Sequence, residues 1–170
     1  MRSRGSSADI AALVANTATP RIRSATGLQY AALPWRLRDG ELEVLLLTSR
    51  QSKRWIIPKG WPIEGLAAPA AAAQEAFEEG GLVGKVSLER LGSYHYFKRL
   101  KNGITVPCKV DVYPLEVLRQ RRDWPEKHQR TLKWCTALEA ATAVTEADLK
   151  LLIRRFVRLH PATRIAAVEK

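Results

Sequence analysis

The feature that most constrains the fold is a run of seven residues, Leu42 to Thr48 (LEVLLLT), in which five side chains are apolar. A strand with one solvent-exposed face alternates apolar and polar residues, and this run stops alternating after its third residue. A run of this kind is typical of a strand that is buried on both faces, so its sheet needs a covering layer on each side. With 170 residues, the chain is long enough for one such domain.

The segments around this run predict the other strands of the sheet. Each is rich in apolar or β-branched residues and is bounded by turn residues. They span residues 28–37, 55–57, 86–97 and 105–115, with two or three strands in the last two ranges. Asn102-Gly103 predicts a hairpin between the last two. Pro34 has no backbone N–H to donate, which predicts an edge position or a bulge for the first strand.

Three helices are predicted to cover the sheet. The first runs from Pro69 to about Glu79 and ends at Gly80-Gly81, because proline suits a first helical turn and glycine suits a helix end. Two more are predicted from pairs with capping-box spacing, Thr136 with Glu139 and Thr145 with Asp148. This order of strands and helices predicts an α/β domain, a sandwich with a mixed central sheet between helices.

Charge and cysteine content limit the partners and the compartment. Residues 27–160 are predicted to form the domain, between an N-terminal tail (1–26) and a C-terminal tail (161–170). No apolar stretch reaches about 18 residues, so no membrane partner is expected. Two widely separated cysteines, Cys108 and Cys135, predict a reducing compartment, the cytoplasm. The net charge of +11 favours anionic partners, although it also serves solubility alone.

The first predicted helix carries three glutamates on one face. Glu75, Glu78 and Glu79 are spaced i, i+3 and i+4, whereas Ala70, Ala73 and Phe77 are expected to face the core. Like charges at this spacing destabilise a helix by about 0.2–0.5 kcal/mol per pair, and anions in its last turn oppose the helix dipole. A bound divalent cation would reverse both penalties. The segment predicts either a metal site or a solvated helix with surplus glutamates.

A basic segment precedes this helix. Arg50, Lys53, Arg54 and Lys59 place four cations within ten residues, and a turn then leads to the acidic helix. Basic groups that face carboxylates across a metal neutralise a polyphosphate, while the metal bridges its oxygens. A solvated basic loop is the alternative interpretation of each cation taken alone.

The spacing of these residues resembles the Nudix signature, which runs Gly, five residues, Glu, seven residues, then Arg-Glu-apolar-any-Glu-Glu-any-Gly-apolar. Gly60 matches its first position, and the segment 74–82 (QEAFEEGGL) matches its end at the correct spacing. Two positions depart from it, because Leu66 replaces the first Glu and Gln74 replaces the Arg. In the family, these two positions help to orient the loop and the acidic helix.

The resemblance implies a Nudix-type α/β/α sandwich that hydrolyses a phosphoanhydride bond with Mg²⁺, or with Mn²⁺ in its place. It also implies that the metal is bound by Glu75, Glu78, Glu79 and the carbonyl of Gly60. Glu79, or in second place Glu75, would be the base that activates water. The substrate would be an anionic small molecule with a di- or polyphosphate.

Beyond the signature, the chain is most similar to the diphosphoinositol polyphosphate phosphohydrolase branch of the family. The similar segments are Ser49-Arg50, Arg54 to Pro58, Asp123-Trp124, Arg130, Trp134 and Glu139-Ala140. The resemblance implies that Arg50 and Lys59 hold substrate phosphates, together with Arg36 or Arg54. Ser49 would add a hydrogen bond.

Three functions remain open from the sequence. The first is hydrolysis of a diphosphoinositol or dinucleoside polyphosphate, and the second is a nucleoside triphosphate or nucleotide-sugar pyrophosphatase. The third is a Nudix-fold module that binds a nucleotide or RNA without cleaving it, which Leu66, Gln74 and the net charge support. Single-stranded RNA binding needs aromatic platforms among basic residues, and only the segment 94–99 (YHYFKR) offers one. Nucleic acid therefore ranks below a small anionic substrate.

Overall fold

A computed structural model describes residues 26–160, so the predicted tails lie outside it except for Thr26. Within this range, eight strands form one sheet. The strands are β1 (Gly27–Arg38), β2 (Glu41–Thr48), β3 (Trp55–Ile56), β4 (Lys59–Gly60), β5 (Leu82–Val86), β6 (Gly92–Arg99), β7 (Thr105–Gln120) and β8 (Leu132–Thr136). The helices are α2 (Ala68–Gly80), α3 (Ala137–Ala143) and α4 (Ala147–Leu159).

The sheet is mixed, as predicted. Its main strand order is β3-β2-β1-β7-β5, while β4 pairs with β1, β6 with β7 and β8 with β2. Strands β1 and β7 run parallel, and the other pairs are antiparallel. The edge or bulge predicted from Pro34 is wrong, because β1 is an inner strand with Pro34 opposite Leu115. The proline is tolerated because the ladder with β2 begins one residue later, at Trp35 and Val44.

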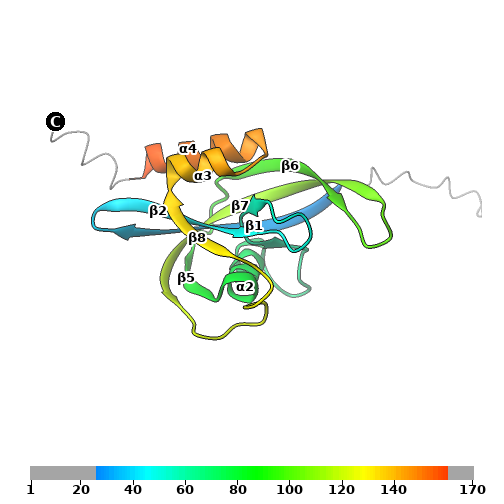
Figure 1. The fold of residues 1–170 in the computed structure, drawn as a ribbon, viewed down its shortest axis with the longest axis horizontal. Helices are drawn as coiled ribbons and strands as arrows, with labels where there is room; N and C mark the ends of the chain where they lie inside the picture. Colours follow the sequence, from blue (N-terminus) through cyan, green and yellow to red (C-terminus); the bar gives the residue numbers. More distant parts are fainter. Residues whose placement is uncertain (1–25, 161–170) are drawn as a thin grey trace, which may run out of the picture.

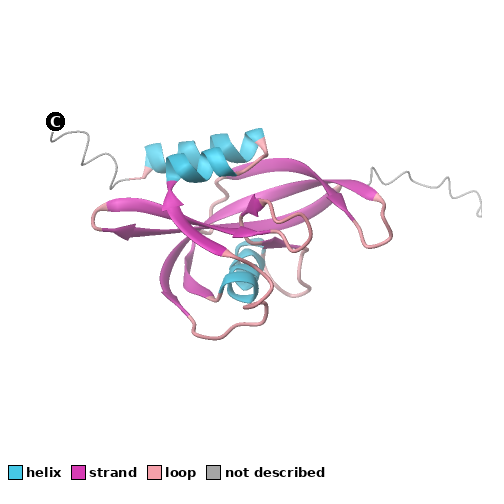
Figure 2. Cartoon of the chain, viewed as in Figure 1, coloured by secondary structure: helices cyan, strands magenta, loops and turns pink. Residues whose placement is uncertain are grey.

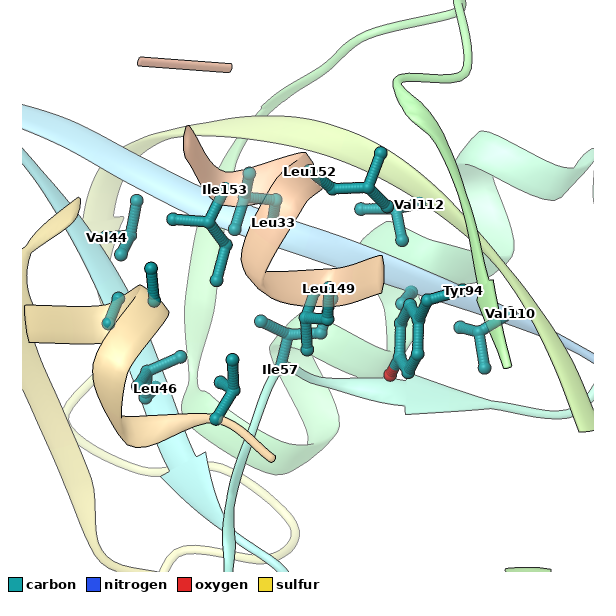
Figure 3. Close-up of a cluster of buried hydrophobic side chains, with 14 of the residues drawn as sticks. Leu33, Val44, Leu46, Ile57, Tyr94, Val110, Val112, Leu149, Leu152 and Ile153 are labelled. Atoms are coloured by element: carbon teal, nitrogen blue, oxygen red, sulfur yellow. The ribbon is translucent and has the colours of Figure 1, made fainter. Parts of the chain in front are cut away.

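Helices cover both faces of the sheet, which confirms the predicted α/β/α sandwich. Helices α3 and α4 lie together on one face and α2 lies on the other (Figures 1 and 2). The layer beneath α3 and α4 contains the larger apolar cluster, to which Leu149, Leu152 and Ile153 of α4 contribute (Figure 3). The run from Leu42 to Thr48 is buried through most of its length, and its side chains enter the clusters on both faces. No described helix is long and apolar enough to cross a membrane.

Several helix and strand limits follow the sequence, but β4 and β8 were not predicted, and β7 continues to Gln120, five residues beyond its predicted end. Thr136 and Glu139 form the predicted capping box at the start of α3. The one predicted from Thr145 is wrong, because α4 begins after Glu146 and has no side-chain cap. Two or three strands were predicted over 86–97 and 105–115, and the structure has three there, β5, β6 and β7, with residues 87–91 outside them. The hairpin predicted at Asn102-Gly103 joins β6 to β7.

Candidate active site

Helix α2 holds its three glutamates close to the sheet. Its buried face consists of the small residues Ala71, Ala72 and Ala76 together with Glu79, whose exposed fraction is only 5%. The core position predicted for Phe77 is wrong, because its side chain is only half-buried and belongs to neither apolar cluster. Because alanine side chains are small, α2 packs close to the sheet through Ala71, Ala72 and Ala76. The helix is rotated so that the carboxylate of Glu79, and not the ring of Phe77, faces inward.

Strand β4 brings the backbone of Gly60 against Glu75. Gly60 pairs with Tyr30 of β1, which fixes its place in the sheet. A Cβ atom on Gly60 would lie 2.0 Å from Oε1 of Glu75, so the carboxylate occupies the space that a side chain would need. The structure thus brings together two of the residues predicted to bind metal.

The loop of residues 121–131, which joins β7 to β8, is fastened to the C-terminal end of α2 (Figure 1). The N–H of Glu126 donates to the carbonyl of Glu78 at 3.0 Å, and the N–H of Arg121 donates to that of Gly81 at 2.8 Å. Gly81 ends the helix at a φ of 68°, and the ring of Trp124 packs so closely over it that a Cβ there would lie 2.5 Å from the ring. These contacts fix the loop relative to the acidic helix.

Arg130 of this loop joins two carboxylates. Its Nη2 donates to Oε1 of Glu79 at 2.8 Å, and its Nε donates to Oε2 of Glu126 at 2.7 Å. Its Nη1 donates to the carbonyl of Thr48 at 3.1 Å, so every nitrogen of the guanidinium has a partner. Sequence analysis missed Glu126, because one glutamate in a polar connection carries no local signal. Arg130 was identified only through the family resemblance, which gave it no role.

The predicted phosphate-binding residues differ in whether they contact these carboxylates. Arg50 is exposed, and its Nη1 lies 3.6 Å from Oε1 of Glu126. The hydroxyl of Ser49 accepts a hydrogen bond from the N–H of Arg54 at 3.2 Å, which closes the turn between them. Arg54 itself forms an ion pair with Glu146 at 3.3 Å, at the start of α4.

Arg36 is not brought to the site. It forms an ion pair with Glu43 of β2 at 2.7 Å, and its guanidinium lies 4.0 Å from the centre of the Trp134 ring. It is six residues along β1 from Tyr30, the partner of Gly60, which is roughly 20 Å in an extended strand.

Two lysines lie over aromatic rings near the carboxylates. The Nζ of Lys59 lies 5.0 Å from the centre of the Tyr96 ring, and that of Lys98 lies 5.6 Å from the centre of the Trp61 ring. Burial lowers the pKa of Lys59 to about 8, although the nearby carboxylate of Glu79 acts in the opposite direction. Neither lysine has a carboxylate within ion-pair distance in the described part of the chain, so both are available to an anion.

Burial makes two of the carboxylates costly to ionise. It raises the pKa of Glu79 to about 7, although Arg130 and Lys59 partly oppose this. Burial also raises the pKa of Glu75, and the negative charge of Glu78 adds to the effect. A cation beside these groups would favour their charged forms.

The donors at this place suit a hard divalent cation. The second oxygen of Glu79, Oε2, is buried and has no hydrogen-bond partner, and carboxylate and carbonyl oxygens are the ligands that Mg²⁺ prefers. The carboxylate of Glu75 lies against the backbone of Gly60 nearby. Between residues 26 and 160, no three acidic, His or Cys side chains are already gathered around one point. The carboxylates would therefore have to converge when the cation binds.

Comparison with known proteins decides the family, since the NUDIX domain model matches residues 27–156. The chain belongs to the Nudix family. Nudix hydrolase 16, mitochondrial, of Arabidopsis thaliana is 29% identical over 173 residues, which cover 92% of this chain and 96% of that protein. Nudix hydrolase 18, mitochondrial, of the same plant is 31% identical and covers 69% of each chain. This Nudix protein is accordingly an enzyme of the hydrolase class.

Solved structures agree with the Nudix fold. The NUDIX domain of Shewanella oneidensis NrtR, complexed with ADP ribose, matches with a TM-score of 0.61 at 19% identity and covers 88% of this chain and 98% of its own. An Ap4A hydrolase of C. elegans in a binary complex matches with a TM-score of 0.58 at 23% identity and covers 77% and 95%. At these identities, the likeness concerns the fold alone.

Proposed function

We propose that this Nudix hydrolase cleaves a phosphoanhydride bond in a polyphosphorylated small molecule, with Mg²⁺ or Mn²⁺ as its cofactor. The observation that carries the proposal is the arrangement of Glu79. Arg130 holds one of its carboxylate oxygens, and the other is buried without a partner beside Lys59. An acidic group placed in this way, in a family of hydrolases, suits metal-assisted attack of water on phosphorus.

The residues of the site would divide the work by charge. Glu75, Glu78, Glu79 and the carbonyl of Gly60 would hold the cation. When bound, a divalent cation polarises phosphate oxygens and lowers the pKa of nearby water. Glu79, or in second place Glu75, would accept the proton of the attacking water. The water oxygen would then bond to phosphorus as the bridging P–O bond breaks.

The basic residues would act on the phosphates instead of on the water. Arg50 is exposed beside Glu126, and Lys59 lies near Glu79, so the two could hold phosphates on either side of the carboxylates. Positive charge placed there would stabilise the negative charge that develops on the leaving phosphate. Ser49 and Arg54 would support the turn that carries Arg50.

Two substrate classes have separate support. A nucleoside or dinucleoside polyphosphate is favoured by the rings of Tyr96 and Trp61, each of which lies against a lysine, because a base can stack on such a ring. Ap4A, named for one solved relative, belongs to this class, and ADP ribose, named for another, is a nucleotide sugar that likewise carries adenosine and a diphosphate. A diphosphoinositol polyphosphate is favoured by the resemblance at Ser49-Arg50.

We place the enzyme in a reducing compartment, the cytoplasm, because both cysteines are free thiols.

The test measures phosphate release from diadenosine tetraphosphate, ATP and a diphosphoinositol polyphosphate, with Mg²⁺ and with EDTA. Glu79→Gln is compared with the native chain. The expected result is turnover of one class that requires Mg²⁺ and falls by about 10²–10⁴-fold in the variant. Metal-independent binding of a nucleotide or RNA without any turnover would refute hydrolysis and favour the non-cleaving alternative.

A further inference from the structure

Arg130 is an internal cation. Its side chain is only 5% exposed, and its three nitrogens donate to Glu79, Glu126 and the carbonyl of Thr48. A buried guanidinium is tolerated only with partners of this quality, because its removal from water is costly. Its rigid planar shape therefore fixes both carboxylates at once, which a single point of charge could not do.

Arg130 engages only one oxygen of each carboxylate. On Glu79 it engages Oε1, so that the buried Oε2 is left without a partner. On Glu126 it engages Oε2, so that Oε1 remains on the side of Arg50. A neighbour that binds one oxygen of a carboxylate orients the other, which is how outer residues of metal sites set their ligands.

The signature positions of this chain do not supply such a cation. Leu66 is an exposed apolar residue, and Gln74 is neutral. The side-chain amide of Gln74 donates to Glu78 at 2.6 Å, so it serves a different glutamate from the one that Arg130 holds. Glu79 therefore receives its support from outside the signature.

The position of Arg130 is itself fixed by the backbone. The N–H of Thr48 donates to the carbonyl of Thr131, and the N–H of Thr131 donates to the hydroxyl of Thr48, each at 3.0 Å. At its other end, the loop is bonded to the last turn of α2 through Glu126 and Arg121. The guanidinium is thus held between the end of β2 and the acidic helix.

We propose that Arg130 is the positioning residue of this site. From its place in the 121–131 loop, it supplies the support that an arginine at position 74 would give. It would orient Glu79 so that its unpartnered oxygen, Oε2, faces the divalent cation. It would also hold Glu126, whose other oxygen pairs with Arg50, beside the last turn of α2. This inference rests on the proposed function for its link to catalysis. Its effect on cation binding can be measured without turnover.

The test measures the Kd for Mn²⁺ by electron paramagnetic resonance, and kcat and KM with the best substrate. In Arg130→Gln, Mn²⁺ binding should weaken by about 10–100-fold and kcat should fall in proportion, while KM changes little. Arg130→Lys should recover part of the Mn²⁺ affinity, because it keeps the charge but cannot reach both carboxylates. Adding Gln74→Arg to Arg130→Gln should also restore part of it.

Arg90→Gln is the matched control. Arg90 also pairs with a carboxylate, that of Asp111 at 3.1 Å, and among residues 26–160 its side chain forms no ion pair or hydrogen bond with α2 or the 121–131 loop. Its Mn²⁺ affinity and kcat should remain within about twofold of the native values, because no ligand of the cation depends on it. Should Arg130→Gln fail to fold in a urea titration, Arg130→Lys decides the question, because it keeps a buried cation.

Three outcomes would overturn the inference. Unchanged Mn²⁺ affinity in Arg130→Gln and Arg130→Lys would show that Arg130 has no part in positioning. Tighter Mn²⁺ binding would make Arg130 a competitor of the cation, and a rise in KM alone would make it a substrate contact. If the native chain hydrolyses nothing but Arg130→Gln still loses Mn²⁺ affinity, then the proposed function fails and the positioning role stands.

Discussion

Helices α2 and α4 each contain 13 residues and cover opposite faces of one sheet, but they are held there by different means. Helix α4 buries the large apolar side chains Leu149, Leu152 and Ile153 and exposes its arginines. Its own sequence is therefore sufficient to dock it. Such amphipathic packing is the usual source of helix stability in proteins.

Helix α2 depends on segments that are distant in the sequence. It buries alanines and one carboxylate, and its last carbonyls are satisfied from outside, that of Gly80 by the side chain of Gln120 and that of Gly81 by the N–H of Arg121. Its three glutamates repel one another, and those in its last turn interact unfavourably with the helix dipole, so α2 is a poor helix by itself. Helix α2, which carries the candidate metal ligands, is therefore stabilised by its surroundings, and α4 is stabilised by its own apolar face.

The largest expected effect separates the two helices by stability. Ile153→Ala should lower the free energy of unfolding by about 2–5 kcal/mol, because it leaves a cavity in the core under α4. Phe77→Ala on α2 should lower it less, since that ring lies outside both apolar clusters. Urea titration measures both. Equal losses would mean that α2 docks through its own apolar residues, and kcat/KM of the folded Ile153→Ala enzyme should be unchanged.

The next prediction compares the surroundings of α2 and α4 by their effect on activity, with a glycine-to-alanine substitution on each side of the sheet. An added Cβ would collide with Glu75 of α2 in Gly60→Ala and, at 2.5 Å, with Leu152 of α4 in Gly92→Ala. Both obstacles are the ends of flexible side chains. Gly60→Ala should lower kcat/KM by about 100-fold with little loss of stability, because a displacement of about 1 Å at a reacting centre has an effect of this size.

Gly92→Ala should do the reverse. Crowding the apolar core should lower the free energy of unfolding by about 1–3 kcal/mol and leave kcat/KM unchanged. For each variant, steady-state hydrolysis gives kcat/KM and urea titration gives the free energy of unfolding. Full activity in Gly60→Ala would show that the contact between Gly60 and Glu75 has no role in the reaction.

The same difference explains what the sequence could predict. The limits of α2 and the capping box at Thr136 were predicted because their signals are local: Gly80-Gly81 at a helix end, and Thr136 with Glu139 three residues later. The two-sided burial of β2 was predicted from its four consecutive apolar residues, 44–47. Features written within a few neighbouring residues can be recognised before any tertiary contact is known.

Features that depend on tertiary contact could not be predicted. Arg130 lies 51 residues after Glu79, and no spacing rule connects them. The rotation of α2 was predicted wrongly because Phe77 is the more apolar residue, yet close packing through Ala72 and Ala76 decided which face turns inward. Pro34 was assigned to an edge because sequence cannot show that the ladder between β1 and β2 begins after it.

The most gradual effect concerns pH and the carboxylate of Glu79 on α2. Burial raises the pKa of Glu79 to about 7 in the folded chain, above its ordinary value near 4.5, while Arg130 offsets part of the burial. The protonated form is therefore favoured by folding. Its contribution to stability is fully present below about pH 4.5 and is lost as pH rises through about 7. In EDTA, the stability of the native chain relative to Glu79→Gln should fall from pH 5 to pH 8.

Saturating Mg²⁺ should cancel or reverse this decline, because the cation favours the charged carboxylate only in the folded chain. Urea titrations at pH 5, 6, 7 and 8, with EDTA and with Mg²⁺, measure the difference directly. Subtracting Glu79→Gln removes the contribution of Glu75, whose pKa burial also raises. A difference that does not vary with pH in EDTA would mean that Arg130 fully compensates the burial of Glu79. The acidic end of α2 would then be stable without a cation, and the contrast with α4 would reduce to packing alone.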